Sequence, residues 1–190
     1  MSTKKLTTAA LDPTGVGYPA GDGSALVNVA PANDSVGPTK LGSGIPVKYG
    51  YAESTAYSAI TATIPFDDTL PQITEGGPVV SLAYSPIAVG NKLLVDVVVP
   101  IATNGASQAI VALFKGSAAD AIVSASQDCA SGATTHLKLR KLLTVDALGS
   151  VTYSVRAGAA SGNSYINGQA AARKLGGALT ASITITEFKA

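Results

Sequence analysis

The stretch Ala181-Ser-Ile-Thr-Ile-Thr186 alternates apolar and hydroxyl-bearing side chains along its whole length. Successive side chains of a β-strand point to opposite faces, so Ala181, Ile183 and Ile185 would pack inward while their neighbours face outward. The stretch Val151-Thr-Tyr-Ser-Val-Arg156 repeats this pattern. These alternations predict strands that each bury one face, as in a sheet that packs against a second layer.

Short runs of this kind continue from Tyr49 to the C-terminus, with turn-forming residues between them at the spacing of an all-β sandwich or barrel. No long stretch keeps apolar residues at the spacing of a helix, so we expect a minimal helix content. The predicted strands lie near residues 57–64, 79–85, 92–99, 108–115, 119–126, 135–143, 150–157, 163–170 and 180–187.

Two short stretches indicate how some strands are placed. Leu93 to Val99 is apolar on both faces apart from Asp96, which predicts a central strand covered on both sides, by the second sheet or by a neighbouring subunit. Asn167-Gly168 stands between two strand-like runs and is a strong signal for a two-residue hairpin turn of type I′.

The composition limits the class of protein. The chain has 190 residues, of which 46% are apolar and 13% charged, against a usual charged share of about 25%. So few charges cannot solvate the whole surface of a monomer, and we expect other subunits to cover part of it. The net charge is +1 and there is no basic run, so nucleic acid is not an expected partner. Neither a signal peptide nor a membrane-spanning apolar run is visible.

The first 48 residues differ in character from the rest. They are rich in Gly, Pro, Ser, Asn and Asp, and only a short alternation near residues 25–29 interrupts them. Such a segment cannot bury enough apolar surface to offset the entropy that it loses on ordering. We therefore expect an extended, mostly irregular N-terminal arm and linker over residues 1–48, ordered by another protein chain, and a β-sandwich over residues 49–190.

Three carboxylates, Asp67, Asp68 and Glu75, lie among prolines and just before Gly76-Gly77. Adjacent acids on an extended backbone point to opposite faces, which does not suit the paired acids of a hydrolase. Asp and Thr form hydrogen-bonded turns, prolines end strand pairing, and glycines allow unusual dihedral angles. We favour a turn between two strands. The alternatives are a hard-cation site built from these three carboxylates and, less favoured, catalysis.

The single histidine and the single cysteine exclude several kinds of site. His136 and Cys129 are the only residues of their types, so multi-histidine sites, multi-cysteine sites and an internal disulfide cannot form. His136 alternates with Lys138 and Arg140, which places it on a solvated or interface face, and Cys129 is expected to fill a small buried position. No nucleophile elbow or phosphate-binding glycine fingerprint is present, so we assign no catalytic residue and no cofactor.

Tyr153, Tyr165 and Arg173 combine aromatic rings with a guanidinium, which suits contact with a glycan or a protein. Tyr153 also fits an inward position of its strand, so packing in the core is the favoured interpretation. The patch is kept as an alternative.

Several blocks of the sequence resemble a family of virion-surface domains of tailed bacteriophages. In that family the domain caps the C-terminal end of tail fibres and also occurs on smaller head proteins. The resemblance extends from Tyr49 to the C-terminus and does not closely cover residues 1–48, although Leu41-Gly-Ser-Gly-Ile-Pro46 looks like the short linker that precedes the domain in fibres. The blocks are Tyr51-Ala-Glu-Ser-Thr55, Ile64-Pro-Phe-Asp-Asp-Thr-Leu-Pro-Gln72, Asn91-Lys-Leu-Leu-Val95, Ala112-Leu-Phe114, Tyr165-Ile-Asn-Gly168, Arg173-Lys-Leu-Gly-Gly177 and Ser182-Ile-Thr-Ile-Thr-Glu187.

The resemblance implies an antiparallel jelly roll similar to the heads of tumour-necrosis-factor and complement-type proteins. It also implies a homotrimer around a three-fold axis on the virion surface, assembled in the host cytoplasm, and it brings no enzymatic residues to this sequence. The fold class we expect is therefore all-β, an antiparallel jelly-roll sandwich preceded by an extended arm.

Three functions compete under this resemblance. In the first, the chain is a trimeric capsid decoration protein whose residues 1–48 bind the major capsid protein or another virion protein. In the second, it is a short tail fibre or spike whose knob binds a host-surface glycan or receptor. The third, a polysaccharide-degrading enzyme, needs an acid pair that the sequence does not clearly offer. We favour the first, because a fibre normally has a long repetitive shaft and this arm has none.

Overall fold

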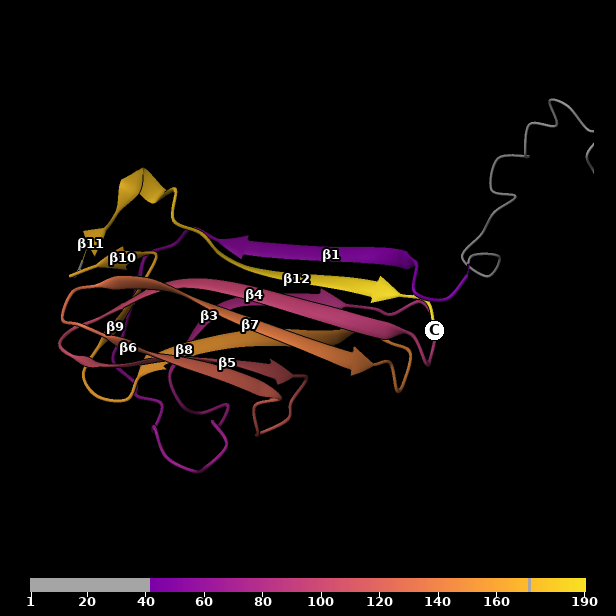
Figure 1. Ribbon diagram of the computed structural model, residues 1–190, viewed down its shortest axis with the longest axis horizontal. Helices are drawn as coiled ribbons and strands as arrows, with labels where there is room; N and C mark the ends of the chain where they lie inside the picture. The colour runs from indigo at the N-terminus through magenta and orange to yellow at the C-terminus, as the bar shows by residue number, and fades with distance from the viewer. Residues whose placement is uncertain (1–41, 171) are drawn as a thin grey trace, which may run out of the picture. The chain divides into compact units, whose positions relative to one another are not determined.

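The computed structural model describes residues 42–170 and 172–190, and these form two antiparallel β-sheets packed face to face (Figure 1). The predicted all-β class is confirmed, because the one helical element in these residues is a 3₁₀ turn, Leu175–Gly177. None of the described residues belongs to a helix long and apolar enough to cross a membrane. The strands are β1 (Pro46–Ser54), β2 (Ser58–Ile60), β3 (Gly77–Tyr84), β4 (Lys92–Thr103), β5 (Ser107–Lys115), β6 (Val123–Cys129), β7 (Thr134–Thr144), β8 (Val151–Ala159), β9 (Ser164–Ile166), β10 (Gly168–Gln169), β11 (Ala172–Arg173) and β12 (Ala181–Phe188).

Eight long strands have the order of a jelly roll. The first sheet has the order β1-β12-β4-β7 and the second has the order β3-β8-β5-β6, with every neighbouring pair antiparallel. The short strands β9 and β2 extend the first sheet beside the far end of β4. Most connections pass from one sheet to the other, which gives the two interlocked Greek keys of a jelly roll. The expected fold is therefore confirmed by the strand order itself.

β4 is the central strand of the first sheet, as the apolar run around Asp96 predicts. It pairs with β12 on one side and with β7 on the other. Its inward side chains, such as Val97, are buried against the second sheet in one continuous core, which also contains the free thiol of Cys129 as expected. Its outward side chains Leu94, Asp96 and Val98 are only half-buried. Within one chain, the outward side of β4 is therefore open over this stretch, while Pro100 and Ala102 farther along the strand are buried.

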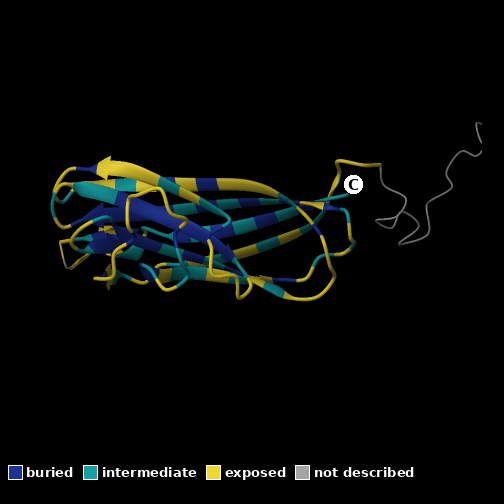
Figure 2. Ribbon diagram, turned by 90° about the horizontal axis from the view of Figure 1, so that it is seen from below, coloured by how far each residue is buried: buried dark blue, intermediate teal, exposed yellow. Residues whose placement is uncertain are grey.

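The second sheet carries a partial cover on its outer side, formed by residues 61–76, which we call the crossing loop. The outward side chains of β5, including Phe114, are buried, and Phe114 packs with Ala121 and Ile73 of the segments that lie over the sheet. Figure 2 shows the continuous burial that results along β5. The two sheets therefore differ in where they are covered: the second sheet is covered along β5, and the first sheet is open except at the far end of β4, where Ala102 and Tyr165 are buried.

β1 is a strand that the sequence analysis missed. It begins at Pro46, so the expected domain boundary at Tyr49 falls inside it, and it pairs with β12 along most of its length. Its inward positions are filled by Lys48, Gly50, Ala52 and Ser54 rather than by large apolar residues, so it lacks the usual alternation. The arm over residues 1–41 lies outside the described residues.

Some predicted strands have different bounds. The strand expected over residues 57–64 shrinks to β2, because Pro65 and the start of the crossing loop follow it. The strand expected over residues 119–126 begins only at Val123 and continues to Cys129. The remaining expected strands, apart from residues 163–170, correspond to long strands of the sandwich, within a few residues at either end.

The predicted hairpin turn at Asn167-Gly168 is wrong. Asn167 has a positive φ of 55°, but Gly168 pairs with Arg173, so these residues join β9 to β10 instead of reversing the chain. The side chain of Asn167 is buried, and its Nδ2 donates to the carbonyls of Ser54 at 2.7 Å and Ala56 at 3.0 Å. Hydrogen bonds to residues more than a hundred positions earlier therefore fix the conformation of Asn167. The two-residue turn pattern carries no information about such distant partners.

Candidate functional site

One open surface with a regular arrangement is the outward side of the first sheet across β1, β12, β4 and β7, which we call the outer face. Strand register aligns its side chains in three rows across β1, β12, β4 and β7. The rows are Tyr49, Thr186, Leu94 and Leu142; then Tyr51, Thr184, Asp96 and Arg140; then Glu53, Ser182, Val98 and Lys138. Eight of these twelve side chains are uncharged, and the two acids balance the two bases.

Large apolar and aromatic groups stand at both edges of the outer face. Tyr49 is 63% exposed on β1, and Leu142 is 59% exposed on β7. The rings of Tyr49 and Tyr51 stack, with centroids 6.5 Å apart and planes 11° from parallel. The hydroxyl of Tyr51 donates to Glu53 Oε2 at 2.5 Å, and this hydrogen bond raises the pKa of the phenol. The two rings therefore form one aromatic surface along the edge strand.

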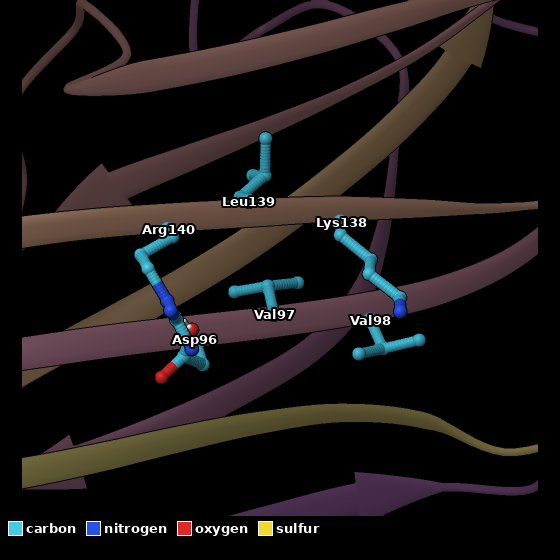
Figure 3. A pocket seen from close by; sticks show the side chains of 6 residues that line it. All are labelled: Asp96, Val97, Val98, Lys138, Leu139 and Arg140. Carbon is cyan, nitrogen blue, oxygen red and sulfur yellow. Dashed lines mark hydrogen bonds and ion pairs between the residues drawn. The ribbon is translucent and has the colours of Figure 1, made fainter.

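The middle of the outer face holds an ion pair beside a shallow hollow. Arg140 of β7 reaches across to β4 and donates from Nε to Asp96 Oδ1 at 2.5 Å, as Figure 3 shows. The hydrogen bond to Asp96 raises the pKa of the Arg140 guanidinium. Next to it, Val98 and Lys138 line the rest of a hollow of about 430 Å³. A partner protein could contact this hollow and the charged groups of Asp96 and Arg140 beside it. The two groups form an ion pair with each other, which differs from the two separated carboxyl groups of a hydrolase.

His136 lies where the sequence predicts. It is exposed on the outward side of β7, in series with Lys138 and Arg140, while Leu137 and Leu139 on the inward side are buried. Within residues 42–170 and 172–190, no three His, Cys, Asp or Glu side chains come together in a way that could hold a metal ion. His136 therefore contributes to a polar surface.

The structure does not bring the three sequence-predicted carboxylates together into a site. Asp67 Oδ1 accepts hydrogen bonds from the backbone N–H of Thr69 at 2.8 Å and from its hydroxyl at 2.6 Å. Glu75 Oε2 accepts from the backbone N–H of Gln72 at 2.8 Å. Asp67 and Glu75 each close a turn of the crossing loop, and Asp68 is exposed beside them. The favoured interpretation, turn chemistry between two strands, agrees with these contacts.

The alternative patch of Tyr153, Tyr165 and Arg173 does not form. Tyr153 is 3% exposed and packs in the hydrophobic core, while Tyr165 is 7% exposed and lies on the outward side of the first sheet, level with Ala102 of β4. Tyr165 stacks on Tyr57, with ring centroids 6.4 Å apart. Arg173 is exposed on the short strand β11, without an aromatic surface formed by these two tyrosines. The favoured interpretation of Tyr153 as a core residue is confirmed.

Glu187 is a buried acid that the sequence analysis did not select. It is fully buried at the last inward position of β12, after Ile183 and Ile185. Its carboxyl group accepts hydrogen bonds from Tyr84 Oη at 3.0 Å, Asn91 Nδ2 at 2.7 Å and the backbone N–H of Ile87 at 2.9 Å. Burial is the main cause that raises the pKa of the Tyr84 phenol, and the hydrogen bond to Glu187 raises it further. The phenol therefore keeps the proton that it donates in this bond.

The surroundings of Glu187 define a structural role. Ile87 and Asn91 belong to the connection between β3 and β4, so the carboxyl group ties that connection to the C-terminal strand. Asn91 in turn accepts through Oδ1 from the backbone N–H of Ala190. Glu187 continues the series of inward residues Ala181, Ile183 and Ile185 in β12. This alternation is the sequence signal that could have identified Glu187 as a buried acid.

Comparisons with known proteins give likeness of fold alone. No protein-family model matches the chain, and no curated protein matches it. Among solved structures, Eiger TNF from S. frugiperda is 10% identical, with 75% of this chain and 93% of that one covered and a TM-score of 0.44. The carbohydrate-binding module CBM36 in complex with calcium and xylotriose is 15% identical over 71% and 98%, with a TM-score of 0.33. A chain of infectious bursal disease virus, Gx strain, is 11% identical over 76% and 38%, with a TM-score of 0.30.

Proposed function

We propose that the chain is a non-enzymatic structural protein of a bacteriophage virion, a trimeric capsid decoration protein. The arm that precedes β1 would bind the capsid shell, and the jelly roll would form an outer knob. The observation that supports it is the outer face, a broad sheet surface on which the small hydroxyl side chains of β12 lie between the exposed rings of Tyr49 and Tyr51 on β1 and the exposed Leu142 on β7. Contact with two further copies would remove this apolar and aromatic surface from water.

The charges of the outer face favour a ring over a two-fold dimer. Glu53 lies on β1, at one edge of the first sheet, while Lys138 and Arg140 lie on β7, at the other edge. If the β1 edge of one copy meets the β7 edge of the next, an acid faces bases at every contact. Such a head-to-tail contact closes into a ring when the rotation between copies permits, and three copies give the trimer of the proposal.

Thr184→Arg is expected to dissociate the trimer. Thr184 lies in the middle row on β12, so a long charged side chain there would have to be buried at the contact or force the faces apart. Sedimentation at micromolar concentration should show a trimer for the unaltered chain and mostly monomer for the variant. The matched control is Thr152→Arg on the outward side of β8, in the other sheet, which should remain trimeric. A stable monomer of the unaltered chain would refute the proposed assembly.

Removal of residues 1–41 is expected to abolish capsid binding while the trimer persists. The cut leaves β1 paired with β12, and it keeps the bonds from Gly44 N to the Lys189 carbonyl at 2.7 Å and from Lys189 N to the Ile45 carbonyl at 3.0 Å. Three arms on one trimer would act together through their high effective concentration, so their loss should remove all detectable attachment. Co-sedimentation with empty capsids measures this, and undiminished attachment of the shortened chain would contradict the proposed role of the arm.

A short tail fibre or spike is the second candidate. It shares the trimeric knob and differs in its place on the particle, where the arm would attach to the tail and the knob would meet the host surface. Immunogold labelling of particles separates the two, because gold over the head supports a decoration protein and gold confined to the tail supports a fibre.

A further inference from the structure

The crossing loop is fixed to the sandwich at both ends. At its start, Ile64 is 1% exposed and its backbone N–H donates to the carbonyl of Ala159 at 3.1 Å. At its end, Arg156 of β8 donates from Nε to the Glu75 carbonyl at 2.7 Å and from Nη2 to the Gly76 carbonyl at 2.8 Å. These anchors hold the part between them, residues 65–71, in a defined position over the second sheet.

The tip of this loop forms a hollow of about 200 Å³ against β5 and β6. The ring of Phe66 lines it and is 62% exposed, an unusual position for a large aromatic side chain. The polar groups that line it are the carboxylate of Asp67 and the hydroxyls of Thr69, Ser124 and Ser126. Thus one aromatic face and four hydrogen-bonding groups meet in a small concave site that is lined by the crossing loop, β5 and β6.

Much of the hydrogen-bonding capacity in this hollow is unused. Asp67 receives both of its bonds from Thr69 on Oδ1, and no bond to Oδ2 is formed by the described residues. The side chains of Ser124 and Ser126 are exposed on β6 and likewise make no hydrogen bond within the described part of the chain. The site can therefore both donate and accept hydrogen bonds toward a ligand.

We propose that the hollow between the tip of the crossing loop and β6 binds a single neutral sugar unit of a glycan. A pyranose ring has an apolar face of C–H groups that can stack on an aromatic side chain such as Phe66, and hydroxyls around its rim that pair with carboxylate and serine oxygens. The hollow is smaller than the roughly 300–1,000 Å³ of sites for larger ligands, which fits one sugar unit.

The charge of the site selects against acidic sugars. No Lys or Arg side chain lines the hollow, and hydrogen bonds from the hydroxyl and then the backbone of Thr69 lower the pKa of Asp67, so its carboxylate stays ionised at neutral pH. A uronate or a sialic acid would meet this negative charge without a compensating cation. Neutral hexosides are the ligands that the site favours.

This proposal does not depend on the role on a virion or on the trimer. The hollow lies on the second sheet, on the side of the sandwich away from β1 and β12 (Figure 1), so the assembly proposed for the outer face would leave it accessible. Loss of sugar binding and loss of the trimer are therefore separate results.

The test uses the full chain and a panel of immobilised neutral and acidic oligosaccharides, followed by saturation-transfer NMR and calorimetry with the methyl glycoside of each sugar that binds. We expect a neutral hexoside to bind with millimolar affinity and Phe66→Ala to weaken it by about tenfold or more. The matched control is Leu70→Ala, since Leu70 is 58% exposed on the same loop but does not line the hollow. It should bind as the unaltered chain does.

Phe66→Ala tests the stacking contact, and a second variant, Ser126→Val on β6, tests the hydrogen bonds. Ser126→Val should weaken binding of the neutral hexoside, because it removes a hydroxyl without altering the loop. Unchanged circular dichroism and unfolding temperature establish that each variant is folded. The proposal is overturned if no neutral hexoside binds, if acidic sugars bind more tightly than neutral ones, or if Phe66→Ala and Leu70→Ala bind equally well.

Discussion

Glu187→Ala is expected to lower the free energy of unfolding by about 3–5 kcal/mol, the largest effect of any single substitution considered for this chain. The change leaves the hydroxyl of Tyr84, the amide of Asn91 and the backbone N–H of Ile87 buried without their acceptor. Each of these groups would lose its hydrogen bond without gaining one from water, which is the costly way to remove a buried pair. The β3–β4 connection would also lose its attachment to β12.

Chemical denaturation followed by far-UV circular dichroism measures this loss. Glu187→Gln should fall between the parent and the alanine variant, because the amide keeps one acceptor but turns its NH₂ group toward donors. Asp68→Ala removes an exposed carboxylate of the crossing loop and should change stability by no more than about 0.5 kcal/mol. A loss for Glu187→Ala as small as that of Asp68→Ala would show that the buried carboxyl group is dispensable.

Gly76→Ala is expected to destabilise the sandwich by about 2–4 kcal/mol. Gly76 has a positive φ of 57°, and a Cβ atom there would lie 2.4 Å from the carbonyl oxygen of Ala157 on β8. Because that oxygen belongs to the backbone of a central strand, it cannot move aside as a flexible side chain would. The substitution would push the end of the crossing loop away from the sheet and strain the two bonds from Arg156.

Gly176→Ala is the matched control for this prediction. Gly176 has a nearly identical φ of 62°, but nothing lies within 4 Å of the position that a Cβ would take. It should therefore lose only the roughly 1–2 kcal/mol of backbone strain, and the difference between the two variants measures the contact with Ala157. Equal losses, measured as unfolding midpoints of the purified proteins, would show that the contact between position 76 and Ala157 costs nothing.

The strands that were predicted well share one property: apolar and polar side chains alternate regularly along them, and the apolar ones pack in the core. β12 and β8 bury the side chains that the pattern assigned to their inward faces. β1 escaped prediction because its inward residue Gly50 leaves room for the ring of Tyr84, whose atoms would come within 2.8 Å of a Cβ on Gly50. Because the inward position is a glycine, β1 shows no alternation of apolar side chains there by which it could be recognised in the sequence.

The candidate sites were predictable to different degrees. The turn at Asp67 and the need for a glycine at position 76 follow from local chemistry, and both agree with the structure. The donors around Glu187 come from a connection nearly a hundred residues earlier, so only its inward position could be inferred from sequence. The aromatic hollow at Phe66 depends on where the loop tip meets β6, which requires the fold.

The pairing of β1 with β12 has a practical consequence for protein engineering. The two strands are antiparallel, and the bond from Gly44 N to the Lys189 carbonyl places the start of the domain beside its C-terminus. A cargo fused after Ala190 would therefore emerge beside Gly44, at the end of the sandwich where β1 begins. A cargo inserted instead at Gly162, which lies beside Asn104 just after the end of β4, would project from the opposite end of the sandwich, so the chain offers two separate attachment sites.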